Sequence, residues 1–135
     1  MATEAGHTVM RHDVVADEPS IIAEHLRVWA DDGLCDVILT TGGTGLTARD
    51  VTPEATLEVA EREVPGIATA LVVNGLQFTP YAALTRGVAV TRGTTLIVNL
   101  PGSPKAVAQG MDVLLPLFTH VTELLEGPVD HGKPA

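Results

Sequence analysis

The sequence predicts an α/β protein in which helices pack on a mostly parallel central sheet. Hydrophobic residues make up 45% of the 135 residues, yet the chain has one tryptophan, one tyrosine and two phenylalanines. An aliphatic core of this kind favours helices on a parallel sheet over an all-β sandwich. Short apolar runs of strand length, such as Val37 to Leu39, also alternate along the chain with segments of helical periodicity.

Charge and composition exclude several classes of protein. Eight Lys and Arg stand against 17 Asp and Glu, a net charge of −9, which argues against general nucleic-acid binding. No window holds the roughly 18 consecutive apolar residues of a membrane span, and no signal peptide is visible. Cys35 has no partner for an internal disulfide. We expect a globular, cytoplasmic protein that binds neither nucleic acid nor membrane.

The first part of the chain predicts a βαβ unit. Residues 8–15 indicate a strand near a sheet edge, and Asp17-Glu18-Pro19-Ser20 is typical of a helix start. The helix continues through apolar residues at three-to-four spacing and ends at residues 31–33. Residues 37–40 follow as a strand buried on both faces. Two strands joined by one helix are expected to be parallel, with a right-handed crossover.

The middle of the chain predicts two helices and a short turn. Thr52-Pro53 opens a helix over residues 53–63, as N-cap and first helical residue, and Pro65-Gly66 ends it. Residues 67–76 form a second, mostly apolar helix. Thr79-Pro80 repeats the Thr-Pro opening for a short turn that stops near Arg86.

The last part predicts a hairpin and a long helix. Residues 88–90 and 95–100 read as two strands about a turn at 91–94. Ser103-Pro104 begins a helix that runs to about residue 125 and is kinked or restarted at Pro116. The sequence thus predicts one domain over residues 1–127, followed by a flexible C-terminal tail over 128–135.

Two strand-to-turn junctions predict a ligand pocket. Residues 40–45 lead from a strand into a glycine loop, and residues 99–104 lead from a second strand into a Pro-Gly turn. Both should lie at the carboxyl edge of the sheet, where α/β proteins place ligands. Glycines let backbone N–H groups approach phosphate oxygens. The loop matches neither the dinucleotide fingerprint nor the P-loop, so a plain flexible turn is the alternative.

Two acidic residues are candidates for a metal site. Asp50 follows Arg49 directly after the glycine loop, and Asp17 follows the first predicted strand. Asp50 is suited to hold Mg²⁺ while Arg49 meets phosphate. The alternatives are that Asp17 caps a helix and that Asp50 only pairs with Arg49. The five histidines show no metal-ligand spacing, and no G-x-S-x-G elbow is present, so we set aside zinc and hydrolase chemistry.

The combined motifs resemble one known family over residues 8–127. The chain contains Thr-Thr-Gly-Gly-Thr-Gly at 40–45, Arg-Asp-Val-Thr-Pro-Glu-Ala-Thr at 49–56 and Glu-Val-Pro-Gly at 63–66. Thr-Arg-Gly follows at 85–87, and Leu-Ile-Val-Asn-Leu-Pro-Gly-Ser-Pro-Lys at 96–105. This string strongly resembles the molybdopterin-binding domain of molybdopterin adenylyltransferases and of the related molybdenum cofactor biosynthesis protein B. The full string is far more specific than any one of its pieces.

The resemblance implies a three-layer α/β/α fold, usually trimeric, and an adenylyl transfer. Molybdopterin phosphate attacks the α-phosphate of Mg-ATP, pyrophosphate leaves, and the adenylated product is ready for molybdate insertion, with a molybdenum insertion protein as a possible partner. By matching motifs, Asp17 and Asp50 would be the essential acids and Mg²⁺ ligands. The residues expected to bind substrate are Thr40, Thr41, Gly42, Gly43, Thr44, Gly45, Arg49, Asn99, Pro101, Gly102 and Ser103.

One departure concerns the beginning of the chain. Members of the family usually begin with a further strand that ends in a Ser-Asp loop, and residues 1–7 resemble only the last turn of the helix after it. We therefore expect an N-terminally truncated domain with an exposed sheet edge. A non-catalytic molybdopterin-binding or oligomerisation module, inactive because that segment is missing, is the alternative function.

Overall fold

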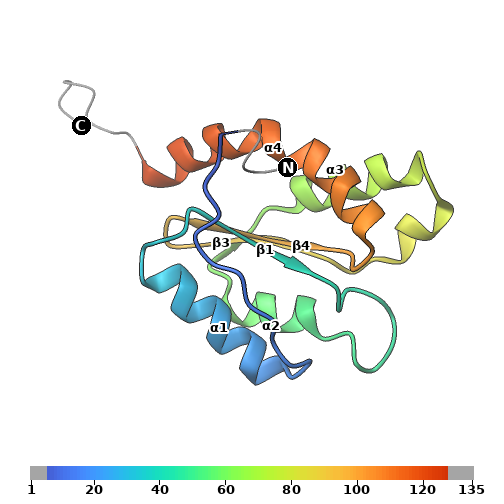
Figure 1. Ribbon diagram of the computed structural model, residues 1–135, viewed down its shortest axis with the longest axis horizontal. Coiled ribbons are helices and arrows are strands. Elements are labelled where there is room, and N and C mark those ends of the chain that lie inside the picture. The colour runs from blue at the N-terminus through green and yellow to red at the C-terminus, as the bar shows by residue number, and fades with distance from the viewer. Residues whose placement is uncertain (1–5, 128–135) are drawn as a thin grey trace.

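The computed structural model describes residues 6–127, which form a four-stranded mixed sheet between two layers of helices (Figure 1). The strand order is β1-β4-β3-β2. β1 and β4 are parallel, whereas β3 pairs antiparallel with both β4 and β2. The elements are α1 (Pro19–Asp31), β1 (Val37–Thr41), α2 (Thr52–Val59), β2 (Arg62–Glu63), α3 (Pro65–Leu76), the 3₁₀ helix η1 (Pro80–Leu84), β3 (Ala89–Arg92), β4 (Thr95–Leu100) and α4 (Pro104–Glu126).

The helices divide the core into two halves, one on each face of the sheet. α1 and α2 cover one face, and α3 and α4 cover the other (Figure 1). Alternation along β4 serves both halves, because Ile97 packs with α1 and α2 while its neighbours Leu96 and Val98 pack with α3 and α4. All three are at most 1% exposed. The predicted three-layer α/β/α architecture is therefore confirmed.

Prolines stand at the start of every helix, and the sequence predicts this for all but α3. Pro65 is expected only to end the preceding helix, but it is the first residue of α3. Each of the five helical elements has proline in its first two positions, where a missing N–H costs nothing. Ser103 caps α4 by accepting a hydrogen bond from the N–H of Ala106 at 3.1 Å. α4 continues unbroken through Pro116, so the predicted restart does not occur. Burial of Leu114 and Phe118 on either side of the proline holds the helix against the sheet.

The first predicted strand is not formed. Residues 7–16 have no regular structure, and they cross the β1 edge of the sheet from the α4 layer to the α1 layer (Figure 1). The His7 ring lies 5.4 Å from the Phe118 ring of α4, and Asp13 pairs with His25 of α1 at 3.0 Å. Val14 is 87% exposed, so its apolar side chain does not signal a buried strand.

Two further predictions are corrected. Since the first strand of the expected βαβ unit is absent and the hairpin of β3 and β4 is present, the described sheet has one parallel and two antiparallel pairings, and it is not mostly parallel. α2 ends at Val59 rather than at residue 63, because Arg62 and Glu63 pair with β3.

The two ends of the chain lie outside the residues that the structure describes. The predicted tail over 128–135 lies outside the described residues, as do residues 1–5. Among the helices of residues 6–127, none has the length and apolar character needed to cross a membrane.

Candidate functional site

The two predicted loops meet at one edge of the sheet. β1 and β4 are parallel neighbours, with Thr41 opposite Leu100, so their carboxyl ends lie side by side. The N–H of Gly42 donates to the carbonyl of Leu100 at 2.9 Å. The loops then approach so closely that a Cβ on Gly102 would lie 3.3 Å from the Cα of Gly42. The expectation that both junctions share one edge is confirmed.

The glycine loop needs glycine for its backbone shape. Gly42 and Gly43 have φ values of 87° and 70°, in the left-handed region that L-residues rarely adopt. A Cβ on Gly43 would also collide with the hydroxyl of Thr52, the first residue of α2. The N–H of Thr52 donates to the Gly43 carbonyl at 3.2 Å, which ties the loop to the start of that helix.

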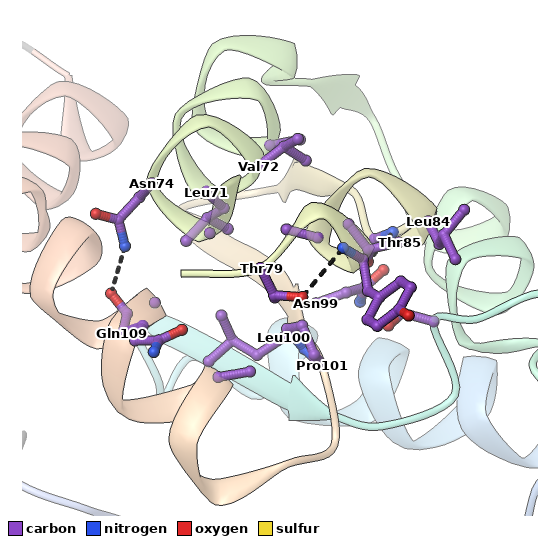
Figure 2. A pocket seen from close by; sticks show the side chains of 18 of the residues that line it. Leu71, Val72, Asn74, Thr79, Leu84, Thr85, Asn99, Leu100, Pro101 and Gln109 are labelled. Atoms are coloured by element: carbon purple, nitrogen blue, oxygen red, sulfur yellow. Dashed lines mark hydrogen bonds between the residues drawn. The ribbon is translucent and has the colours of Figure 1, made fainter. Parts of the chain in front are cut away.

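A cavity of about 290 Å³ opens beside the loops, between β4, α3, η1 and α4 (Figure 2). Its lining is mostly apolar and includes Leu71, Val72, Tyr81, Leu84 and Leu100. The side chain of Asn74 reaches across it from α3 to the carbonyl of Gln109 in α4, at 3.1 Å. Its volume is near the lower end of the range for small-molecule sites, which are likewise mostly apolar with a few polar groups. Four predicted site residues line it, namely Thr44, Gly45, Asn99 and Pro101.

Asn99 is buried and its hydrogen bonds stay within the protein. Its Nδ2 donates to the hydroxyls of Thr40 at 2.9 Å and Thr56 at 3.0 Å, and its Oδ1 accepts from the N–H of Val88 at 3.1 Å. The side chain is 3% exposed. Asn99 and Thr40 therefore join the two strand ends to α2 and to the start of β3.

Asp50 closes the far end of the glycine loop. Its Oδ2 accepts hydrogen bonds from the N–H of Thr47 at 2.9 Å and from the Thr47 hydroxyl at 2.8 Å. These bonds, chiefly that from the hydroxyl, lower the pKa of the Asp50 carboxyl below its ordinary value. Asp50 is not paired with Arg49, so that alternative interpretation is wrong.

Arg49 instead faces the other predicted acid. Its Nη2 lies 3.8 Å from Oδ2 of Asp17, and the two side chains are 85% and 52% exposed. Asp17 does not cap α1, because the N-cap is Glu18 and no side chain bonds there. The end of the glycine loop and the residues before α1 therefore present two carboxylates, Asp50 and Asp17, and one cation, Arg49, near the surface. Within residues 6–127, no group of three or more His, Cys, Asp or Glu is arranged to hold a metal.

The sequence reasoning missed two residues that organise this site. The guanidinium of Arg86 bonds the carbonyls of Gly45 and Asp50, and the carboxylate of Glu54 in α2. Arg86 stood out in the sequence as a cation beside a glycine and as part of a family motif, but neither signal indicates which atoms it binds.

Comparison with known proteins places the chain among relatives of one kind. Residues 1–120 match the family model described as "Probable molybdopterin binding domain". The molybdopterin adenylyltransferase of Escherichia coli K12 is 43% identical over 133 residues, covering 90% of this chain and 68% of that protein. The Drosophila melanogaster protein "Molybdenum cofactor synthesis protein cinnamon" is 45% identical over 84% of this chain, which spans only 19% of it. The Helicobacter pylori J99 molybdopterin adenylyltransferase is 37% identical, and the chain spans 66% of its length.

Solved structures that are similar to this chain come from proteins of the same kind. The molybdopterin biosynthesis Mog protein of Mycobacterium ulcerans superimposes with a TM-score of 0.87 at 39% identity, over 93% of this chain and 80% of the other. The molybdopterin biosynthesis enzyme MoaB of Thermus thermophilus is 54% identical with a TM-score of 0.76, over 82% and 70% of the two chains.

Proposed function

Because the chain belongs to the molybdopterin-binding domain family, we propose that it acts in molybdenum cofactor biosynthesis by adenylylating molybdopterin with ATP. The observation that supports this most directly is the contact of Gly42 with Leu100 and Gly102, which brings two phosphate-compatible loops together beside an apolar cavity. Molybdopterin combines a pterin ring system with a phosphate, so it needs both kinds of surface at once.

The loops and the cavity divide the recognition of such a ligand. The cavity wall from Leu71 and Leu100 takes the ring, because burying an aromatic face there removes apolar surface from water. Residues 43–44 and 102–103 offer backbone N–H groups to phosphate oxygens, whereas the N–H of Gly42 is bonded to Leu100 and Pro101 has none. Thr40, Thr41 and Asn99 hold the strand ends that position these loops.

The donor set fits Mg²⁺. Magnesium in nucleotide sites is usually held by one or two carboxylates, with substrate phosphates and waters completing the octahedron. Asp50 uses Oδ2 for the loop, which leaves Oδ1 for a ligand, and Asp17 is half exposed beside Arg49. We propose that Asp17 and Asp50 hold Mg²⁺ carried by ATP. When bound, the ion neutralises phosphate charge, which these two carboxylates would otherwise repel.

The reaction is a transfer of the adenylyl group. An oxygen of the molybdopterin phosphate forms a bond to the α-phosphorus of ATP, the bond between that phosphorus and its bridging oxygen to the β-phosphate breaks, and pyrophosphate leaves. The chain contributes mainly by orienting the two phosphates and by stabilising charge with loop N–H groups and the exposed Arg49 guanidinium.

The proposal is tested by incubating the protein with molybdopterin and Mg-ATP and measuring adenylated product and pyrophosphate. We expect turnover in the wild type and its loss in Asp50→Ala. Equal rates in the two proteins would overturn the assigned role of Asp50. Binding of molybdopterin without any turnover of ATP would replace an enzyme with a non-catalytic binding module.

We further propose that the protein works as a cytoplasmic homotrimer and passes its product to a molybdenum insertion protein. The stretch 65–85 contains no charged residue, although the chain carries a net charge of −9. Val73, Phe78, Tyr81 and Leu84 are exposed along it. Copies of an acidic protein can meet there without charge repulsion. Light scattering after gel filtration measures the mass, and a monomer at micromolar concentration would exclude the trimer.

A further inference from the structure

Arg86, which follows η1, is bound on nearly all sides by the chain itself. Its Nε donates to the carbonyl of Gly45 at 2.8 Å, and its Nη2 donates to the carbonyl of Asp50 at 2.6 Å. Its backbone N–H donates to the carbonyl of Thr44, also at 2.8 Å. One residue therefore binds three carbonyl groups of the segment that joins β1 to α2.

The rest of the guanidinium faces Glu54 in the first turn of α2. Nη1 donates to Oε2 of Glu54, and Nη2 donates to Oε1 at 3.3 Å. Four of the N–H groups thus meet acceptors of the protein, and guanidinium has about five in all. The carboxylate also balances the charge of Arg86. This residue is accordingly ill suited to bind a phosphate, in contrast to Arg49, which is 85% exposed.

The loop has few other fixed points. Thr52 donates to the Gly43 carbonyl, and Asp50 bonds Thr47 both through its N–H at 3.0 Å and through its carboxylate. The Thr47 and Asp50 contacts lie inside the loop and give it shape, but they do not anchor it to the body. Between residues 44 and 50, the hydrogen bonds to the rest of the described chain come from Arg86.

We infer that Arg86 is a positioning residue, which holds the glycine loop and Asp50 in the ligand-binding conformation without touching the ligand. The planar guanidinium group can bond Gly45, Asp50 and Glu54 together, because its N–H donors are fixed relative to one another. A lysine ammonium, which is a compact point charge, lacks this geometry. Loss of the guanidinium leaves the carbonyls of Gly45 and Asp50 to water, while the backbone bond to Thr44 stays. The loop then loosens, while the two halves of the core remain packed. The link to ligand binding rests on the proposed function, whereas the link to loop order does not.

Amide hydrogen exchange in the ligand-free protein tests the inference. The informative amides are those of Thr47, Asp50 and Thr52, since each donates a hydrogen bond that shapes or anchors the loop. In Arg86→Met and Arg86→Lys we expect these amides to exchange at least about tenfold faster than in the wild type. Lysine keeps the charge but lacks the fork, so a charge effect alone would leave Arg86→Lys like the wild type.

Arg92→Met is the matched control. Arg92 bonds the Asp31 carboxylate through two nitrogens, at 2.9 and 3.0 Å, and the carbonyl of Val59 at 3.0 Å. It is the same kind of fork at the hairpin end of β3, where β4 begins rather than ends. Replacing Arg92 should leave the exchange rates of the loop amides as they are in the wild type. Glu54→Gln, which only loosens the guanidinium of Arg86, is the milder variant if Arg86→Met does not fold.

Titration with inorganic pyrophosphate separates positioning from direct binding. In the wild type, side-chain N–H resonances of Arg49 should shift, and those of Arg86 should stay where they are. With molybdopterin and Mg-ATP, Arg86→Lys should lose about 100-fold in kcat/KM, the scale of a misplaced reactive group. The inference fails if the loop amides of Arg86→Met exchange like those of Arg92→Met, or if pyrophosphate shifts Arg86. If the loop amides of Arg86→Met exchange faster but the wild-type protein shows no turnover, the proposed function alone is wrong and the inference about Arg86 stands.

Discussion

Replacing the Asn99 amide by a carboxyl of the same shape tests whether this residue holds the ends of β1 and β4 to α2. In Asn99→Asp the volume is kept, but both donors to Thr40 and Thr56 are lost. The hydroxyl of Thr56 already donates to the Thr52 carbonyl at 2.8 Å, so it cannot turn to meet the new oxygen. Two acceptors then face each other in a site that is 3% exposed.

The expected cost follows from the bonds that are lost. Each neutral hydrogen bond contributes about 1 kcal/mol, and a buried group left without its partner costs about 1–3 kcal/mol. We therefore expect Asn99→Asp to lose about 3–4 kcal/mol of unfolding free energy at neutral pH. That is a large part of the roughly 5–15 kcal/mol that a domain of this size has. It corresponds to a fall of about 10 °C in Tm.

Urea unfolding followed by circular dichroism, at a series of pH values, measures this loss. Burial disfavours the charged form, so the introduced carboxyl has its folded-state pKa raised above its unfolded-state value. Protonation also returns one donor to the site. The variant should thus lie closest to wild-type stability below about pH 4, and the gap should widen as pH rises through the raised pKa.

Asn74→Asp is the matched control, because Asn74 is less buried and its amide makes one hydrogen bond, to the carbonyl of Gln109. It should cost about 1 kcal/mol. If Asn99→Asp costs no more than this control, or if the gap does not change with pH, then the Asn99 network does not hold the strand ends together.

Three other outcomes are expected. Gly43→Ala should lose about 2 kcal/mol in thermal unfolding, because an L-residue at positive φ is strained and its Cβ meets Thr52; equal stability would show that the loop can adopt another shape. In Asp50→Asn the Thr47 amide should exchange faster than in the wild type at neutral pH, and the difference should vanish only well below about pH 4, since the pKa of Asp50 is lowered in the folded state and its bond is lost only as pH falls through that lowered value. Asp17→Asn should weaken Mg-ATP binding by about tenfold in calorimetry with Tm unchanged, because the side chain is 52% exposed; unchanged affinity would remove Asp17 from the metal site.

Much of the fold could be predicted from local chemistry. Proline in the first turn and glycine at the turns mark where helices begin and strands end, and these signals act within a few residues. The same signals placed the two loops at one edge of the sheet. The failures were of another kind. Residues 8–15 carry apolar side chains, but contacts with α1 and α4 decide their path, and such contacts join residues far apart in sequence.

The site was predictable in its backbone and not in its side-chain pairing. The sequence indicates that Asp50 follows a glycine loop, but it does not indicate that Thr47 rather than Arg49 would bind the carboxylate. Arg86 and Glu54 are 32 residues apart and belong to different elements, so no spacing rule joins them. Their pairing depends on where the packing of η1 on α3 places Arg86, and only the folded chain determines that position.

The close approach of Gly42 and Gly102 limits how this site can change during evolution. A methyl group added at position 102 lies 3.3 Å from the opposite Cα, and that Cα already belongs to the smallest residue. A tight contact between larger side chains can be relieved by trimming the partner, but here nothing remains to trim. Second-site suppressors of Gly102→Ala should therefore not arise at position 42. They would have to shift a whole strand end, so this pair of positions is expected to tolerate little drift.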